Sequence, residues 1–355
     1  MTGIDVAMMF GKIGLIFLMV LLPFAVYSTL VERKVSAWNQ NRYGPNRVGP
    51  WGLLQPLADG IKFFFKEELV PDGASPLLFK LAPALSAAPA MLTIAIVPVT
   101  FPVLVEGRQF AMSIADIDVA VPFFLAMGSF AVYGILLGAW ASNSRYSLLA
   151  GLRSSAQMIS YELAMFLSVV TVVLLAGSMN LTEIFLAQTP NATLGQETSG
   201  LWNVFRFPVG TIAFVVFLIA AFAETNRHPF DMVERETEPV GGFHTEHSSM
   251  KFALFFIGEY AAMLTMSALI TTLFFGGPSL FGLVASMESP WLRAGVGFAV
   301  FITKLAVFQF LFIWVRWTLP RFRWDQVLHL GWKVLLPVSI VNLLLAGALV
   351  VWGVY

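Results

Sequence analysis

The chain has 355 residues, of which 58% are hydrophobic and 12% are charged, and 21 Lys and Arg residues balance 21 Asp and Glu residues. Soluble domains carry about 25% charged residues, so this composition excludes an ordinary soluble enzyme, a disordered chain and a basic nucleic-acid-binding protein. The lack of cysteine excludes disulfides, thiolate zinc sites and iron–sulfur clusters held by this chain. The composition therefore predicts a polytopic membrane protein.

A bilayer core of about 30 Å needs about 20 mostly apolar residues per helix. Eight stretches meet this requirement: residues 10–31, 83–105, 120–141, 157–177, 208–224, 252–275, 295–317 and 334–350. The first is longer than the apolar run of about 7–15 residues in a signal peptide, and no small-residue cleavage site follows it. Because no internal repeat or linker interrupts the chain, we predict one all-α membrane domain over residues 1–355, with eight transmembrane helices.

The basic residues predict the orientation of these helices. The first, third, fifth and seventh loops hold sixteen: Arg33, Lys34, Arg42, Arg47, Lys62, Lys66, Lys80, Arg145, Arg153, Arg227, Arg235, Lys251, Arg316, Arg321, Arg323 and Lys333. The N-terminus and the even-numbered loops hold four: Lys12, Arg108, Arg206 and Arg293. Since short cytoplasmic loops carry the excess of basic residues, we expect the odd-numbered loops in the cytoplasm and both termini on the outer, periplasmic side.

The first cytoplasmic loop, residues 32–82, contains a segment too short to span a membrane. In residues 53–68 apolar side chains recur at helical spacing, while Asp59, Lys62 and Lys66 share another face. Before it, the Gly and Pro residues of Arg-Tyr-Gly-Pro-Asn-Arg-Val-Gly-Pro at positions 42–50 predict a fixed, non-helical path. Residues 53–68 therefore predict an amphipathic interfacial helix, which on composition alone is typical of a lipid-headgroup anchor.

A second cytoplasmic segment, residues 224–251, is strongly acidic. It holds six carboxylates: Glu224, Asp231, Glu234, Glu236, Glu238 and Glu246. Like charges beside a low-dielectric wall raise one another's pKa and titrate together, so such a cluster could hold and release protons near neutral pH. The alternative is a solvated acidic loop, although the first of these carboxylates lies at the end of an apolar span.

Three more ionisable residues, Glu162, Glu259 and Lys304, lie within or at the edge of predicted spans. An ionisable residue at membrane depth costs several kcal/mol and favours a functional role. The three could form stations of a proton or cation path. They could also form a structural ion pair between Lys304 and Glu162 or Glu259, and the two interpretations are compatible.

The sequence His244-Thr245-Glu246-His247 lacks the His-Glu-x-x-His spacing of zinc helices, and no cysteine supports it. We therefore expect no metal site.

Several motifs, in a fixed order, carry a resemblance to a known family. They are Glu32-Arg33-Lys34 with residues 42–50, Gly-Ala-Trp-Ala-Ser-Asn-Ser-Arg-Tyr at positions 138–146, residues 151–162 ending in Ser-Tyr-Glu, Glu-Thr-Asn-Arg at positions 224–227, and Pro-Phe-Asp at positions 229–231. Over nearly its whole length the chain resembles the H subunit of NADH–quinone oxidoreductase, the proton-pumping respiratory complex I.

The resemblance implies a membrane subunit that forms the tunnel by which quinone, a bound substrate, enters from the bilayer. It implies partner subunits of the peripheral arm and of the membrane arm, with the flavin (FMN) and iron–sulfur clusters on those partners, lipid around the chain, and a bacterial inner membrane as the location. No complete catalytic site is expected on this chain. The quinone-tunnel residues implied are Arg33, Arg42, Asp59, Lys62 and Phe230. The proton-coupling residues implied are Glu162, Glu224, Arg227, Asp231, Glu234, Glu236, Glu238, Glu246, Glu259, Tyr260 and Lys304.

The acidic segment departs from the usual family pattern at Val233, Arg235, Pro239, Gly241, Phe243, His244 and His247. His247 replaces an aromatic hydroxyl, and we expect it to titrate near neutral pH. Two other functions are compatible with an apolar chain holding buried charges: the related subunit of a membrane-bound hydrogenase complex, and a proton-coupled solute carrier. A carrier is disfavoured because no inverted repeat is found, and a plain membrane anchor would not need Glu259 or Lys304 at depth.

Overall fold

The computed structural model describes residues 3–105, 108–190, 200–232, 241–287 and 289–354, and nearly all of its regular structure is helical. The first elements are α1 (Gly3–Gly14), the π-helical η1 (Leu15–Leu21), α2 (Leu22–Asn39), η2 (Pro50–Gly52), α3 (Gln55–Phe65), α4 (Pro76–Thr93), η3 (Ile94–Ile96), β1 (Val103–Val105) and β2 (Arg108–Phe110). They are followed by α5 (Ala120–Ala141), α6 (Arg145–Ala176), α7 (Leu181–Ala187), η4 (Asn203–Phe205), α8 (Val209–Glu224), α9 (Ser249–Phe274), α10 (Pro290–Thr318), α11 (Trp324–His329), the π-helical η5 (Leu330–Leu335) and α12 (Leu336–Val351).

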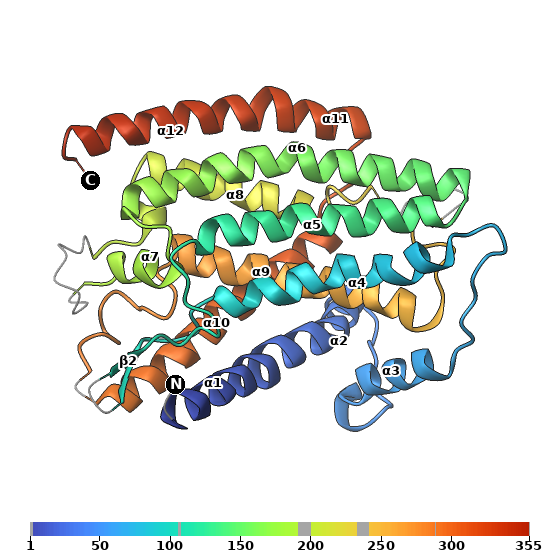
Figure 1. Ribbon diagram of the computed structural model, residues 1–355, viewed down its shortest axis with the longest axis horizontal. Helices are drawn as coiled ribbons and strands as arrows, with labels where there is room; N and C mark the ends of the chain where they lie inside the picture. The colour runs from blue at the N-terminus through green and yellow to red at the C-terminus, as the bar shows by residue number, and fades with distance from the viewer. Residues whose placement is uncertain (1–2, 106–107, 191–199, 233–240, 288, 355) are drawn as a thin grey trace.

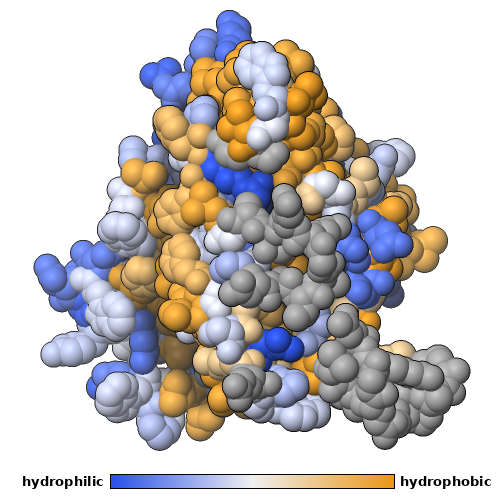
Figure 2. Space-filling model, turned by 90° about the vertical axis from the view of Figure 1, so that its left-hand side faces the viewer, coloured by the Kyte–Doolittle hydropathy of each residue, from blue (hydrophilic) through white to orange (hydrophobic). Residues whose placement is uncertain are grey.

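The long helices lie side by side and run between two ends of the molecule (Figure 1). Both chain termini, α7 and the β1–β2 hairpin lie at one end, on the left of the view, and α3 lies at the other. Figure 2 looks onto the end that carries the termini, where hydrophilic and hydrophobic residues are mixed and hydrophobic ones dominate the upper part, near α12. The predicted arrangement, with the termini together and the amphipathic helix opposite them, matches this architecture.

Within the described residues, seven helices are long and apolar enough to cross a membrane. They are Met9–Asn39, Pro76–Ile96, Ala120–Ala141, Arg145–Ala176, Ser249–Phe274, Pro290–Thr318 and Trp324–Val351. The remaining predicted span, residues 208–224, corresponds to α8, which is apolar but has 16 residues. At 1.5 Å per residue it is about 24 Å long, shorter than a bilayer core of about 30 Å. The chain is thus a multi-pass membrane protein, and the eighth crossing stays a prediction.

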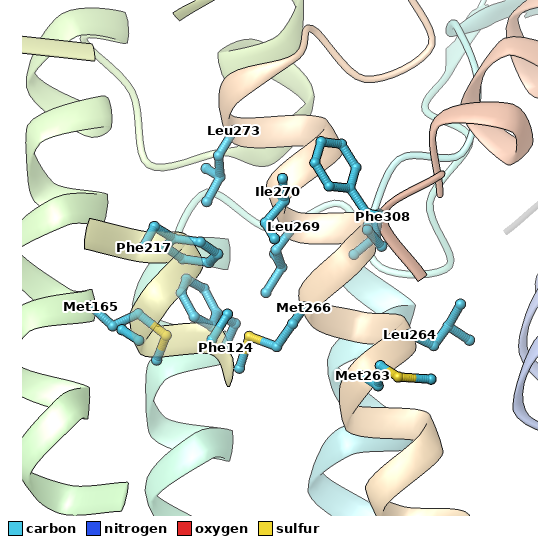
Figure 3. Packing of buried hydrophobic residues seen from close by; sticks show 14 of the residues in the cluster. Phe124, Met165, Phe217, Met263, Leu264, Met266, Leu269, Ile270, Leu273 and Phe308 are labelled. Carbon is cyan, nitrogen blue, oxygen red and sulfur yellow. The ribbon is translucent and has the colours of Figure 1, made fainter. Parts of the chain in front are cut away.

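The core is built around α9. In the most apolar stretch of α9, 72% of the residues are buried, against 22% in the helix formed by α11, η5 and α12. Figure 3 shows side chains of α9 between Phe217 of α8 and Phe308 of α10, with Phe124 and Met165 completing the packing. A helix that is apolar all round and buried all round is typical of the centre of a membrane bundle.

Helices α4 and α5 approach one another closely at Gly134. A Cβ at this position would lie 2.4 Å from the backbone nitrogen of Ser86 and 2.7 Å from its Cα. Such distances are far inside van der Waals contact, so only glycine fits. Small residues allow backbones to approach in this way in membrane bundles, where dispersion contacts replace the hydrophobic driving force.

The second predicted span, residues 83–105, is wrong at both ends. The helix runs over Pro76–Ile96, and Val103–Val105 forms β1, which pairs antiparallel with β2, Val103 opposite Phe110. Pro76 fits the first helical position, where its missing N–H has no partner to lose. Pro98 cannot continue a helix and disfavours the helical conformation at Val97, so the helix ends at Ile96.

Other predicted boundaries shift because helices extend beyond their apolar stretches. The first span continues to Asn39, so Glu32, Arg33 and Lys34 lie on α2 rather than in a loop, and the fourth begins at Arg145. The predicted amphipathic helix over residues 53–68 is observed as α3, Gln55–Phe65. Polar helical turns therefore project past the apolar spans at the end of the bundle opposite the termini.

Candidate functional site

A buried ion cluster connects α2 and α9 to the segment that follows α8. Arg227, with 1% of its side chain exposed, donates from Nη1 to Oε2 of Glu32 over 2.8 Å. Its Nε lies 2.6 Å from Oε1 of Glu259. Glu32 lies on α2 and Glu259 on α9, so one guanidinium joins two helices that are distant in sequence.

Two further residues complete this cluster. Nη1 of Arg316, on α10, lies 2.5 Å from Oε1 of Glu32, and the hydroxyl of Tyr260 donates to Oε2 of Glu32 over 2.8 Å. The Arg227 guanidinium also lies over the ring of Tyr260, 4.7 Å from its centre. We refer to Glu32, Arg227, Glu259, Tyr260 and Arg316 as the Arg227 cluster.

The charges of the Arg227 cluster balance, with two carboxylates against two guanidiniums. Burial alone would lower the pKa of Arg227, but the carboxylates of Glu259 and Glu32 together raise it well above its ordinary value. Arg227 is therefore fully charged. Buried charges of this kind persist when each is paired and hydrogen-bonded, because an unpaired charge at the same place would be strongly destabilising.

Next to the Arg227 cluster lies a cavity of about 110 Å³, lined mainly by residues of α4, α5 and α9 and by the segment after α8. Its ionisable lining residues in the described chain are Glu224, Asp231, His244 and Glu259. Glu259 belongs both to this cavity and to the Arg227 cluster, so the two adjoin. We call this space the acidic cavity; a water takes about 30 Å³ of liquid volume, so the cavity has room for several.

Glu162, on α6, stands close to the acidic cavity. It accepts a hydrogen bond from the Ser129 hydroxyl of α5, and it is near enough to Glu224 for the two carboxylates to repel one another. Four carboxylates, Glu162, Glu224, Asp231 and Glu259, are thus gathered from α6, α8, the segment after α8 and α9. This arrangement can hold protons at several neighbouring positions.

Asp231 is anchored by the segment between α10 and α11. Its Oδ2 lies 3.6 Å from Nη2 of Arg321, and the backbone N–H of Phe322 donates to the carbonyl of Pro229 over 3.2 Å. Arg321 also donates from Nε to Nε2 of His228. These bonds hold residues 228–231 against residues 321–322.

A second group of predicted residues lies on α2 and α3. Nη1 of Arg33 is 2.7 Å from Oδ2 of Asp59, whose other oxygen accepts from Gln55, and this ion pair joins the two helices. The ammonium of Lys62 lies 4.8 Å from the centre of the Phe63 ring. Arg42 is exposed and donates to the side chain of Gln40 over 2.6 Å.

Four large apolar residues of α3 do not pack into this chain. Leu57, Ile61, Phe64 and Phe65 are all more than half exposed, and Phe65 is 87% exposed. An amphipathic helix with an uncovered apolar face is typical of a membrane interface.

Comparison with known proteins gives the family. The family model described as NADH dehydrogenase matches residues 12–347. Similar relatives include an H subunit of the NADH-quinone oxidoreductase of Geobacter metallireducens, 49% identical over 98% of this chain and 97% of the relative, and the protein of the same name from Cytophaga hutchinsonii, 44% identical over 92% of each chain. The H subunit of the NADH-quinone oxidoreductase of Thermomicrobium roseum is 46% identical over 96% of each chain. The chain belongs to the family of NADH-quinone oxidoreductase H subunits.

In this family member, Lys304 lies apart from the carboxylates. Its ammonium donates to the carbonyls of Phe275, Gly277 and Ser279 at 2.6, 2.9 and 2.5 Å, and it lies 4.3 Å from the centre of the Trp202 ring. The alternative of an ion pair between Lys304 and Glu162 or Glu259 is therefore not realised. Carbonyls freed beyond the end of α9 satisfy this cation instead.

The remaining predicted residues are distributed as follows. Glu234, Glu236 and Glu238 lie outside the described residues, as do Val233, Arg235 and Pro239. Glu246 is half-buried in the turn before α9. Phe230 is 3% exposed and packs in the core against Tyr161 and Phe322.

His247 differs from its expectation. It stacks on Phe79 with the ring centres 4.0 Å apart, and burial, reinforced by the charge of Lys251, lowers its pKa to about 4. The expectation that it titrates near neutral pH is therefore wrong. In its neutral form this histidine packs as an aromatic ring.

Sequence reasoning missed three members of the site as functional residues: Glu32, Arg316 and His244. Glu32 and Arg316 read as charges flanking apolar spans, where snorkelling to the interface is the ordinary outcome. Both lie inside continuous helices, and Glu32 is 5% exposed. Helix continuity past the apolar stretch is the signal that could have found them.

Among the described residues, no group of three or more His, Asp or Glu side chains could hold a metal ion.

Proposed function

We propose that this chain is the membrane subunit of an NADH–quinone oxidoreductase complex that forms the quinone-access tunnel and couples quinone reduction to proton translocation. The observation that carries the proposal is the contact between the acidic cavity and the Arg227 cluster through Glu259. The names of the relatives support membership of such a complex. Its flavin and iron–sulfur clusters would reside on partner subunits, and the complex would lie in a bacterial inner membrane.

The tunnel would begin at α3. A quinone tail is apolar, and the exposed apolar side chains of α3 would let it enter from the bilayer without crossing water. The Arg33–Asp59 ion pair fixes α3 to α2, and Arg42 and Lys62 supply positive charge near the entrance. Phe230 would contribute from the core side, next to Asp231.

The coupling step would use the buried carboxylates. Forming a quinol takes up two protons, and nearby carboxylates can supply them or respond to the change of charge. Glu224, Asp231 and Glu259 would exchange protons within the acidic cavity, and Glu162 would extend the path toward α6. Arg227 would fix the position of Glu259, and Tyr260 that of Glu32. The coupling roles of Glu234, Glu236, Glu238, Glu246 and Lys304 stay predictions.

Glu224→Gln tests the proposal, because it removes a titratable group but keeps the shape of the side chain. We expect NADH-driven quinone reduction and proton pumping in membrane vesicles to fall together by roughly tenfold or more. Glu183→Gln, an exposed carboxylate on α7, is the matched control and should leave both rates unchanged. Normal turnover with a normal proton yield in Glu224→Gln would overturn the coupling role.

A further inference from the structure

Among the described residues that line the acidic cavity, His244 is the only nitrogen base. The other ionisable lining residues, Glu224, Asp231 and Glu259, are carboxylates. A group that lies among carboxylates and can both accept and release a proton can carry protons between those that do not contact one another. A neutral imidazole can do so, because one of its nitrogens accepts a hydrogen bond while the other donates one.

Three aromatic rings surround the imidazole of His244. The ring centres of Phe243, Phe252 and Phe256 lie 5.3, 5.4 and 6.1 Å from its own. Phe252 and Phe256 come from the first turns of α9, and Phe243 precedes His244 in the turn before that helix. The side chain is half-buried and lines the cavity.

Charged groups face His244 from each neighbouring element. They are Glu224 at the end of α8, Asp231 in the segment after it and Glu259 on α9, which share the cavity lining with it, and the neutral His247 lies close by in its own turn. Among the described cavity-lining residues, α4 and α5 contribute no ionisable side chain. Burial lowers the pKa of His244, while Asp231 opposes this shift. The ring is therefore neutral at neutral pH and able to accept a proton.

We infer that His244 is a proton-relay residue of the acidic cavity, which it lines together with Asp231, Glu224 and Glu259. The inference rests on the proposed function and adds a residue to it. Protonated Asp231 gives its proton to one ring nitrogen, and the other nitrogen releases its proton to the carboxylate of Glu224 or Glu259, directly or through cavity water. Asp231 ends as a carboxylate, the receiving acid ends protonated, and the imidazole returns to its neutral form.

His247 provides a natural comparison within the same turn. It is three residues away and is also surrounded by aromatic rings, those of Phe79 and Phe255, but it does not line the cavity. If the aromatic surroundings alone explained a histidine here, replacement of either residue by phenylalanine would have the same small effect. A relay role predicts a difference between the two positions.

The test uses the whole complex in membrane vesicles, with NADH and a short-chain quinone, and measures turnover and proton pumping from about pH 5.5 to 8, the range in which histidine titrates. The variants are His244→Phe and the matched control His247→Phe, with His244→Asn as a second, polar variant in case phenylalanine blocks assembly. We expect His247→Phe to follow the wild-type profile. We expect both His244 variants to pump roughly fivefold more slowly and to lose one ionisation from the pH profile, with an unchanged KM for quinone.

The outcomes separate this inference from the proposed function. If the pH profile of a His244 variant has the same shape as that of the wild type, whatever its absolute rate, the residue has a structural role and the relay is overturned. If in addition Glu224→Gln abolishes pumping, the proposed function stands without His244. If Glu224→Gln pumps normally, the proposed function itself fails. Loss of the ionisation in both His244 variants, with His247→Phe unchanged, supports the relay.

Discussion

Arg227 shows how a full charge is kept where water hardly reaches. Its guanidinium has 1% exposure and yet contacts two carboxylates and one aromatic ring. The fixed fork of donors on arginine can serve Glu32 and Glu259 at once, which the point charge of lysine cannot do as well. Paired buried charges add little net stability compared with apolar residues, so the cluster argues for a functional requirement rather than for stability.

Arg227→Met should destabilise the protein strongly, because it leaves Glu32 and Glu259 with one fewer positive partner in a buried site. Breaking a buried ion pair from one side costs about 3–5 kcal/mol. We expect a large fall in the amount of assembled complex on native gels and in the temperature at which it dissociates. Arg227→Lys, which keeps the charge, should recover part of the loss. Equal stability of the methionine variant and the wild type would contradict the buried pairing.

His247 predicts a loss of stability on acidification. Its pKa is about 4 in the folded chain against an ordinary value of 6.5. Between pH 4 and pH 6.5 this histidine is therefore protonated in the unfolded chain but not in the folded chain. Stability is therefore complete above about pH 7 and falls as the pH drops toward 4, by about 2 kcal/mol at pH 5. His247→Phe should remove this part of the pH dependence.

The measurement for His247 is the thermal midpoint of the purified complex at about pH 7.5 and at about pH 5, on either side of the ordinary histidine pKa. The drop between the two pH values should be smaller for His247→Phe than for the wild type. The exposed His329 on α11 gives the control, and His329→Phe should behave as the wild type does. An identical drop in His247→Phe and the wild type would contradict the buried, neutral histidine.

At the scale of elements, hydropathy found the seven long helices but not their ends. Hydropathy identifies only the part of a helix whose side chains face lipid or the protein core. The helix itself continues through polar turns, as it does to Asn39 and from Arg145. A helix end that is set by a proline could be predicted. Pro76 and Pro98 mark the limits of the helix that hydropathy alone placed at residues 83–105.

The candidate site shows the same division. Arg227, Asp231 and Glu259 could be selected from the sequence, because charges at the end of an apolar stretch or within one are rare. Their partners could not be selected, since Glu32 lies 195 positions from Arg227 and 284 positions from Arg316, and the three residues meet only through helix packing. Pairing at such separations is a property of the fold and leaves no periodic signal in one sequence.

The contact of α4 with α5 predicts a strong effect of one methyl group. Gly134→Ala would place a Cβ 2.4 Å from a backbone atom of Ser86, so the helices would have to separate. Overpacking of this kind costs about 1–3 kcal/mol. Gly347→Ala on α12 is the matched control, because nothing lies within 4 Å of the added atom. We expect complex assembly, followed on native gels, to fall in Gly134→Ala alone, and equal assembly of both variants would contradict the close approach.

At the scale of the whole molecule, charge is sorted along the bundle. Helix α3 lies at one end, and the chain termini with the β1–β2 hairpin lie at the other (Figure 1). The net charge of zero is therefore a sum over the chain, and the basic residues are distributed unequally between its loops. From the bias of basic residues we expect the end with α3 to face the cytoplasm.

This assignment can be tested directly because the chain contains no cysteine. Single cysteines at Val354, 59% exposed beside the C-terminus, and at Tyr43, 93% exposed before α3, would each be the only thiol in the chain. A membrane-impermeant thiol reagent added to intact spheroplasts should label Val354→Cys and not Tyr43→Cys. In inverted membrane vesicles, from which the peripheral subunits have been stripped, the pattern should reverse. The opposite pattern would place both termini in the cytoplasm. Labelling of both positions from the same side would require an even number of crossings between them, and that result would contradict α8 as a span.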